Sequence, residues 1–136
     1  MAKSTNDEPP TCPVARALDI IGDRWSLLIV RDAFQGIRRF GEFQSRLDVS
    51  RSVLTQRLRA LVDDGILLSR PAADGSAYHE YQLSEKGTDL ARVIVALAEW
   101  GEHHLYSEQE KQDGALEFNR RQSLREQMLR TGNSSR

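Results

Sequence analysis

The sequence predicts a mostly α-helical fold with one small β-hairpin. Three observations support this class. Apolar residues recur at helical spacing through most of residues 13–65, only two residues separate two of these helical segments, and an Asp74-Gly75 turn signal lies between two short β-prone stretches. The chain has 136 residues, of which 39% are hydrophobic, so it is long enough for one domain with a hydrophobic core.

The N-terminal segment predicts an arm followed by a short helix. Residues 1–10 are polar, end in two prolines and are expected to form a disordered arm. Pro13 suits the first position of a helix because it lacks the N–H that this position leaves unpaired. The apolar spacing therefore predicts a helix over residues 13–21, which Gly22 closes.

Two further helices are expected before residue 48. Asp23 is suited to cap a helix over residues 24–36, in which the predicted inward side chains are Trp25, Leu28, Ile29 and Ala33. A short extended link at residues 37–39 leads to a third helix over residues 40–47. Its anchoring side chains are Phe40, Phe43 and Leu47.

The connection after the third helix is very short. Only Asp48 and Val49 separate it from a fourth helix, over residues 50–65, which Ser50 caps and Gly65 ends. Two short helices joined so closely must cross steeply instead of packing antiparallel. The pair is therefore predicted to be a helix-turn-helix, with the fourth helix in the position of a recognition helix.

The fourth helix has two different faces. Its inward stripe consists of Leu54, Leu58 and Leu61. A polar and basic face, spread over about 140° of arc at 3.6 residues per turn, consists of Arg51, Ser52, Thr55, Gln56 and Arg59. Such side chains suit the donors and acceptors of a DNA major groove. The alternative from the residues alone is an ordinary solvated helix surface.

A hairpin and a long helix are expected to follow. Residues 66–70 and 78–83 are β-prone and flank the Asp74-Gly75 turn, and a hairpin placed after a recognition helix is a wing. Ser84 is suited to cap a final helix over residues 85–106. The apolar arc of that helix is wider than one core contact requires, which predicts that it also packs against a second copy of the chain.

Charge is distributed unevenly along the chain. The formal net charge is −1, which alone does not favour a nucleic-acid partner. Residues 38–59, however, hold six basic and two acidic side chains, a balance of +4, whereas residues 84–117 hold eight acidic and three basic side chains, a balance of −5. Counterion release needs only a local positive surface, so this polarity allows DNA to bind on one side.

Several blocks of the chain resemble one known family. The segments CPVARALDIIGDRWSLLIVRDAFQGIRRFGEFQ, SRSVLTQRLRALVDDGIL, YHEYQLSEKG and LAEWGEHHL are similar, in this order, to the HxlR-type winged helix-turn-helix transcriptional regulators, over residues 12–105. The resemblance to MarR-type regulators is weaker. The HxlR resemblance implies a homodimer that binds pseudo-palindromic double-stranded DNA. The dimer contacts that it implies, together with the wide arc of the last helix, are Val14, Leu18, Ile21, Leu90, Val93, Ile94, Leu97 and Trp100.

The resemblance also places the polar face of the fourth helix against DNA. On chemical grounds we expect Gln56 to read adenine and Arg51 to read guanine, with arginines and Thr55 on phosphates. The predicted DNA-binding residues are Arg38, Arg39, Ser50, Arg51, Ser52, Thr55, Gln56, Arg59 and Arg70. Arg57 points away from this face and is expected to form a surface or intramolecular ion pair. Asp74 is the one charge at the wing tip, where members of the family often carry a basic residue.

Cys12 precedes a helix N-terminus, where the helix dipole favours a reactive thiolate. Several members of the resembled family sense oxidants or electrophiles with a cysteine at this place; the alternative is an inert thiol. The sequence therefore predicts a repressor that an oxidant or electrophile at Cys12, or a small ligand, relieves. The alternative function is a winged-helix module that binds protein, as an antirepressor does, and does not read DNA.

Other classes of function have little support. No apolar run approaches the roughly 20 residues that span a bilayer, and no signal peptide is visible, so we expect a cytoplasmic protein without membrane contact. A single cysteine excludes an intrachain disulfide. There is no glycine-rich phosphate loop or nucleophile motif, which predicts that the chain is not an enzyme and has no cofactor. His103 and His104 diverge on a helix, so no metal is expected.

The composition of residues 107–136 predicts a charged, partly helical extension with a frayed tail.

Overall fold

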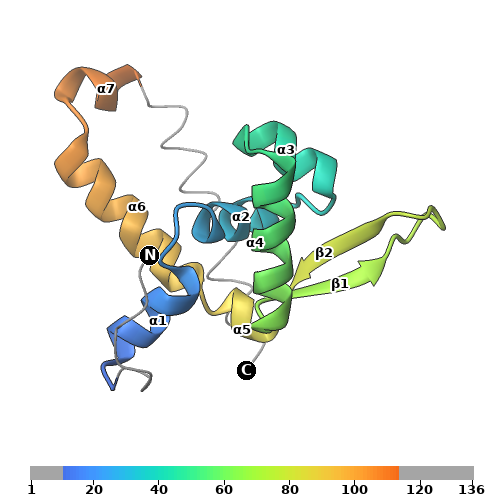
Figure 1. Cartoon of the computed structure of the whole chain (residues 1–136). Coiled ribbons are helices and arrows are strands. Elements are labelled where there is room, and N and C mark those ends of the chain that lie inside the picture. The colour runs from blue at the N-terminus through green and yellow to red at the C-terminus, as the bar shows by residue number, and fades with distance from the viewer. Residues whose placement is uncertain (1–10, 114–136) are drawn as a thin grey trace.

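The structure is a computed structural model that describes residues 11–113. The predicted arm at residues 1–10 and the part of the C-terminal extension from residue 114 onward lie outside this range. Between them the chain forms a compact set of helices with one antiparallel hairpin projecting from it (Figure 1). The elements are α1 Pro13–Ile21, α2 Ser26–Phe34, α3 Phe40–Leu47, α4 Arg51–Asp63, β1 Leu67–Pro71, β2 His79–Leu83, α5 Glu85–Thr88, α6 Ala91–Leu105 and α7 Glu108–Asp113. The predicted fold class is confirmed.

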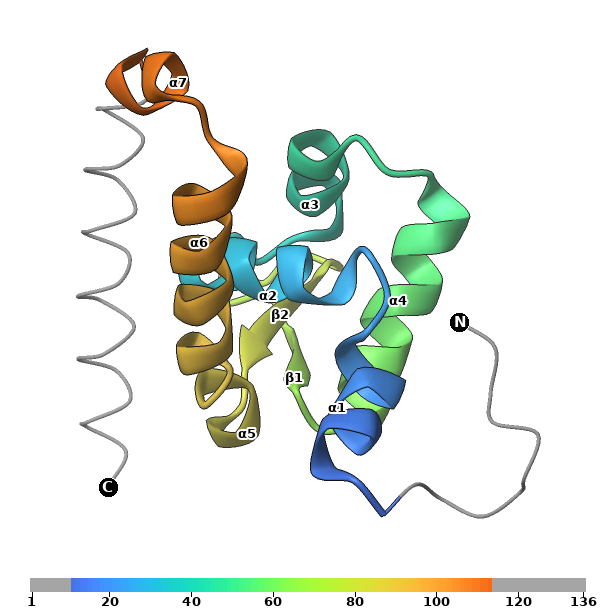
Figure 2. The ribbon, with the colours of Figure 1, turned by 90° about the vertical axis from the view of Figure 1, so that its left-hand side faces the viewer.

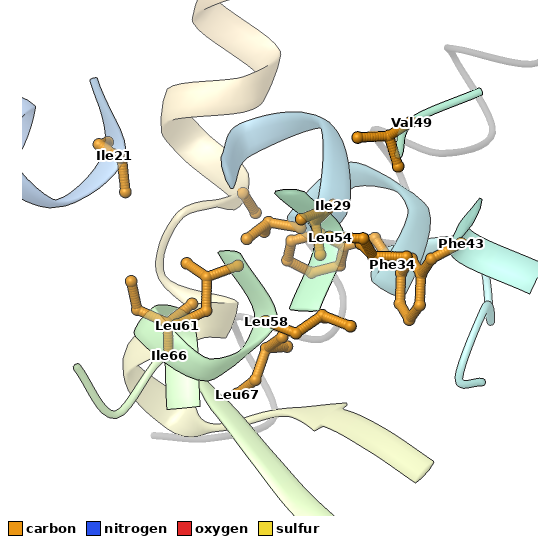
Figure 3. Packing of buried hydrophobic residues seen from close by; sticks show 12 residues of the cluster. Ile21, Ile29, Phe34, Phe43, Val49, Leu54, Leu58, Leu61, Ile66 and Leu67 are labelled. Atoms are coloured by element: carbon orange, nitrogen blue, oxygen red, sulfur yellow. The ribbon is translucent and has the colours of Figure 1, made fainter. Parts of the chain in front are cut away.

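The hydrophobic core lies where α2, α3 and α4 meet the base of the hairpin (Figure 3). The inward stripe of α4 is buried as predicted, with Leu54, Leu58 and Leu61 at most 1% exposed. Phe43 of α3 and Ile29 of α2 are fully buried against it. This packing holds the inner face of α4 and leaves its outer face to solvent.

The start of α2 differs from the prediction by two residues. The helix begins at Ser26 because the carboxylate of Asp23 accepts hydrogen bonds from the backbone N–H groups of Trp25 and Ser26, both at 2.9 Å. The guanidinium of Arg57, on α4, lies 3.4 Å from the same carboxylate. Asp23 therefore caps α2 and also connects it to α4. The predicted intramolecular pairing of Arg57 is confirmed.

Stability at low pH is expected to depend on this cap. Burial raises the pKa of Asp23, but the hydrogen bonds from Ser26 and Trp25 and the charge of Arg57 outweigh it and lower the pKa below 3.8. A lowered pKa stabilises the fold above the unfolded-state pKa, and that stabilisation is lost as pH falls through the folded-state pKa. Asp23→Ala should therefore cost about 0.5–2 kcal/mol of unfolding free energy at pH 7 and less at pH 3. Urea unfolding of both proteins measures this, and a loss of equal size at both pH values would contradict it.

The turn between α3 and α4 forms as the sequence predicts. Asp48 has left-handed backbone angles (φ 50°, ψ 50°), and Val49 is buried beneath the turn. The hydroxyl of Ser50 accepts the N–H of Val53 at 3.3 Å, which is the predicted N-cap of α4. Gly65 follows the helix with φ 76°, a conformation that favours glycine.

The strands of the hairpin lie within one residue of their predicted limits. β1 and β2 pair antiparallel from Leu67 opposite Leu83 to Pro71 opposite His79. In the turn, Gly75 has φ 80°, and the carboxylate of Asp74 accepts the N–H of Ser76 at 2.9 Å. The carbonyl of Arg38 accepts the N–H of Tyr81 at 2.8 Å, so the link before α3 is tied to β2.

The prediction of a single final helix over residues 85–106 is wrong in one respect, because this segment is divided into α5 and α6. Ser84 caps α5 as predicted, since its hydroxyl accepts the N–H of Gly87 at 3.0 Å. Gly87 lies so close to the residue that precedes β1 that an added Cβ would be 2.2 Å from the carbonyl oxygen of Ile66. This close approach fixes the direction of α5. The chain bends at Asp89 and Leu90 before α6 continues along α2.

An arginine pair holds a buried carboxylate between α2 and α3. Asp32 is fully buried, and its Oδ1 accepts hydrogen bonds from Arg31 at 3.1 and 3.2 Å and from Arg46 at 3.4 Å. The Nε of Arg46 lies 3.4 Å from the other carboxylate oxygen, and its Nη2 donates to Gln35. Arg46, although basic and half exposed, is thus committed to fixing α3 on α2.

Candidate nucleic-acid interface

The outer face of α4 gathers the predicted polar side chains on one exposed surface. They line a shallow hollow made by Arg51, Ser52, Thr55, Gln56 and Arg59. Because Leu54, Leu58 and Leu61 hold the opposite face in the core, these side chains must point to solvent. Ser50 differs from the rest of the predicted set, because its hydroxyl already serves as the cap of α4.

A wider groove runs from this face to the hairpin. Its walls come from α3, α4 and both strands, and it shares Arg51, Thr55 and Arg59 with the outer face of α4. Aromatic side chains contribute to the lining: Phe40, Tyr78 and Tyr81. In Figure 1 the hairpin projects beyond α4 on the side away from α1 and α6. The chain therefore offers a cationic helix face beside a groove that a projecting hairpin borders.

Two side chains on the N-terminal half of α4 already have partners within the chain. The guanidinium carbon of Arg51 lies 5.1 Å from the ring centroid of Phe40. The hydroxyl of Thr55 donates to the carbonyl of Arg51 at 2.7 Å. Thr55 can therefore meet a ligand as an acceptor, while Gln56 and Arg59 are exposed beside it.

Arg39 is bound to the hairpin. Its guanidinium lies 2.5 Å from the carboxylate of Asp74 and 4.0 Å from that of Glu80, with the ring of Tyr78 at 5.7 Å. The N–H of Ser76 and the guanidinium of Arg39 both lower the pKa of Asp74, and the hydrogen bond to Asp74 raises the pKa of Arg39. In the chain without DNA, Arg39 therefore links the N-terminus of α3 to the hairpin tip, and the predicted phosphate contact of Arg39 would require this pair to break. Arg38, its neighbour, and Arg70 on β1 are exposed.

The predicted dimer residues fall into three groups by exposure. Val14, Leu18, Leu97 and Trp100 are exposed, with Val14 at 65% and Trp100 at 59%. Leu90, Val93 and Ile94 are partly buried against the core of their own chain. The prediction for Ile21 is corrected, because its side chain is 9% exposed and lies in that core. Leu105 and Tyr106, which sequence reasoning missed, extend the exposed apolar surface at the end of α6. Figure 2 shows α1 and α6 on the face turned away from the hairpin.

Cys12 is exposed and immediately precedes α1, with its carbonyl accepting the N–H of Arg16. His103 and His104 lie on α6 with their rings in edge-to-face contact at 4.5 Å between centroids. Within residues 11–113 no three His, Cys, Asp or Glu side chains are grouped to hold a metal ion. Nor is any helix in that part of the chain both long and apolar enough to span a bilayer.

Comparison with known proteins finds relatives over most of the described residues. The family described as HxlR-like helix-turn-helix matches residues 20–109. The HTH-type transcriptional regulator Rv3095 of Mycobacterium tuberculosis is 46% identical over 92 residues, which make up 68% of this chain and 58% of that protein. The chain thus spans less than two thirds of the length of this relative.

Two solved structures are similar in both sequence and fold. PA1607, a proposed transcription factor, has 50% identity and a TM-score of 0.69, with 72% of this chain and 68% of that chain covered. The redox regulator HypR in its oxidised form has 33% identity and a TM-score of 0.62, with 68% of this chain and 97% of that chain covered.

Proposed function

This chain belongs to the HxlR-like helix-turn-helix family and is a transcriptional regulator of the winged-helix type. From that premise, we propose that it is a homodimeric repressor that binds a pseudo-palindromic operator. The observation that supports operator reading best is the outer face of α4. It combines two arginines with amide and hydroxyl side chains, all exposed on one helix that the core holds from behind. A helix can enter the major groove of B-DNA and contact base edges there.

The proposed contacts divide into base reading and phosphate binding. Gln56 is suited to the adenine edge, where its amide can donate and accept at once, and Arg51 to the two acceptors of guanine. Arg59 and Arg38 face the sugar-phosphate strand. Thr55 is left out of the phosphate contacts, because its hydroxyl proton is donated to the carbonyl of Arg51 and a phosphate oxygen needs a donor. Arg39 is left out of this set because Asp74 holds it.

A homodimer would cover the exposed apolar surface of α1 and α6. Val14, Leu97, Trp100 and Leu105 are each more than half exposed in the single chain, and a second copy would remove their apolar surface from water. Pairing two copies through these helices leaves both α4 helices free on the other side, so that each can enter one half-site. Sedimentation velocity of the full chain should give twice the monomer mass. A monomer at concentrations that saturate DNA would contradict the dimer.

We further propose that an oxidant or electrophile relieves repression through Cys12, with a small ligand as the alternative effector. Cys12 is exposed and adjoins α1, and the similar structure HypR is a redox regulator. An exposed thiol can be oxidised to sulfenic acid and then condense with a second thiol. Oxidant should change DNA affinity in the parent protein and leave Cys12→Ser unchanged. The same response in both proteins would remove Cys12 from the mechanism.

Asp74 is expected to lower DNA affinity, because it neutralises Arg39 and adds negative charge beside the groove. Asp74→Asn should therefore tighten binding to all duplexes alike by a few-fold and steepen the salt dependence by about one counterion. Anisotropy titrations at several salt concentrations measure both quantities. Asp63→Asn, which removes a charge at another part of the same groove, is the matched control. Equal gains in DNA affinity from the two variants would mean that the gain does not come from freeing Arg39 from its ion pair with Asp74.

The experiment that tests the proposed function is selection from a pool of random duplexes. Reduced, full-length protein should enrich one sequence with two related half-sites, and titration should show tight, salt-dependent binding to it, well above a scrambled duplex of equal length. Absence of enrichment, with equal and weak binding to both duplexes, would contradict DNA reading and favour the protein-binding alternative.

A further inference from the structure

Phe40 and Arg51 meet where α3 and α4 come together. Each is the first residue of its helix, and the guanidinium carbon of Arg51 lies 5.1 Å from the centroid of the Phe40 ring. The Phe40 ring is partly buried and packs against the hydrophobic core. It is therefore a fixed surface against which the exposed side chain of Arg51 rests.

The contact leaves the hydrogen-bonding capacity of Arg51 unused. A guanidinium attracted to an aromatic face keeps its N–H groups available at its edge, and those N–H groups make the bidentate contact with guanine. None of the ion pairs found among the described residues includes Arg51. The charge is thus held in place without being neutralised, in contrast to Arg39, which Asp74 pairs directly.

Holding Arg51 matters because a long arginine side chain loses rotamer freedom when it binds. Part of that loss has already occurred in a side chain that the free protein holds near its binding position. The benefit applies only to DNA that presents a guanine to Arg51. Duplexes with another base at that place gain little, so preorganisation increases the preference for the cognate site.

We propose that Phe40 is a positioning residue that sets the specificity of the chain for guanine by holding the Arg51 guanidinium at the entrance of the groove. The inference rests on the proposed function and adds to it a residue outside α4 that acts on sequence preference without reading a base. A purely structural role for Phe40 would instead stabilise α3 and affect all DNA complexes equally.

A double-mutant cycle tests the inference. Phe40→Leu keeps an apolar side chain in the core contact and removes the aromatic face. It should weaken binding to the selected duplex about 2- to 10-fold and leave binding to a duplex with the guanine replaced nearly unchanged. In an Arg51→Ala background the same change should have less than about a twofold effect. Thermal unfolding checks that each variant is folded.

Arg59→Ala supplies the matched background, because Arg59 is an arginine on the same face of α4 about two helical turns after Arg51. There, Phe40→Leu should keep its full effect. Two results would overturn the inference even if the wild type still prefers the selected duplex. One is an equal loss of affinity from Phe40→Leu in the wild-type, Arg51→Ala and Arg59→Ala backgrounds, and the other is no loss of affinity for the selected duplex. Equal binding of the wild type to both duplexes would overturn the proposed function, and the inference with it.

Discussion

Phe43→Ala is expected to lower the free energy of unfolding by about 3–5 kcal/mol. The side chain is fully buried on α3, and its ring meets that of Tyr81 on β2 edge-on, with 6.5 Å between centroids and 74° between planes. Truncation removes its burial and leaves a cavity between the helix-turn-helix and the hairpin, where neighbouring backbone elements cannot easily collapse. Urea denaturation followed by circular dichroism measures the loss.

Tyr78→Ala is the matched control for Phe43→Ala, because Tyr78 is an aromatic side chain on the hairpin that is 67% exposed. Its removal should cost less than about 1 kcal/mol, as surface substitutions usually do. A typical domain has only about 5–15 kcal/mol of stability, so Phe43→Ala should also raise the unfolded fraction at physiological temperature. Similar losses from the two variants would show that the α3–hairpin junction is not the packed centre described here.

The second large effect is expected at Gln56, the proposed adenine reader. Gln56→Ala should cost about 1–3 kcal/mol of binding free energy at the selected duplex, roughly 5- to 150-fold in Kd, and should relax the preference at one base pair. The cost would be specific because, in the proposed complex, the amide of Gln56 would pair with one base edge and make no use of phosphate charge. Anisotropy titrations on the selected duplex and on single-base variants measure both quantities.

Arg38→Ala is the comparison that separates base reading from charge. Arg38 is exposed beside the groove and is proposed to contact phosphate, so its loss should weaken binding to every duplex similarly and reduce the salt slope by about one. Equal losses of affinity from Gln56→Ala and Arg38→Ala on every duplex would contradict the assignment of Gln56 as a base reader.

Most of the helices, and the face of α4, could be predicted from sequence because their signals are local. Three signals define α4, and each acts on residues close to its own position: the cap at Ser50, the leucine stripe at Leu54, Leu58 and Leu61, and the glycine at residue 65. Once the stripe is buried, helical geometry alone decides which side chains share the outer face. The five polar side chains predicted on α4 therefore lie together on its outer face, as expected.

The features that sequence reasoning missed depend on contacts between distant residues. The close approach of Gly87 on α5 to the backbone of Ile66 brings together residues 21 positions apart, and no local pattern marks the break between α5 and α6. The pairing of Arg39 with Asp74 spans 35 positions, and no local pattern distinguishes Arg39 from Arg38. Asp32 likewise lies in a helix where a charged residue ordinarily faces solvent, yet Arg31 and Arg46 hold it in the interior.

The most direct test of the central claim is to map where α4 lies on DNA. Gln56→Cys in a Cys12→Ser background has one thiol, since Cys12 is the single cysteine of the chain, and can carry an iron chelate that cleaves nearby DNA. The protein is added at concentrations that saturate the selected duplex, because loss of the Gln56 amide is itself expected to weaken binding. Lys86→Cys on α5, outside the proposed interface, is the control. The predicted result is cleavage at two places about one helical turn apart on the selected duplex from position 56 and none from position 86. Bound DNA that is cut uniformly from position 56, or cut equally from both positions, would contradict a recognition role for α4.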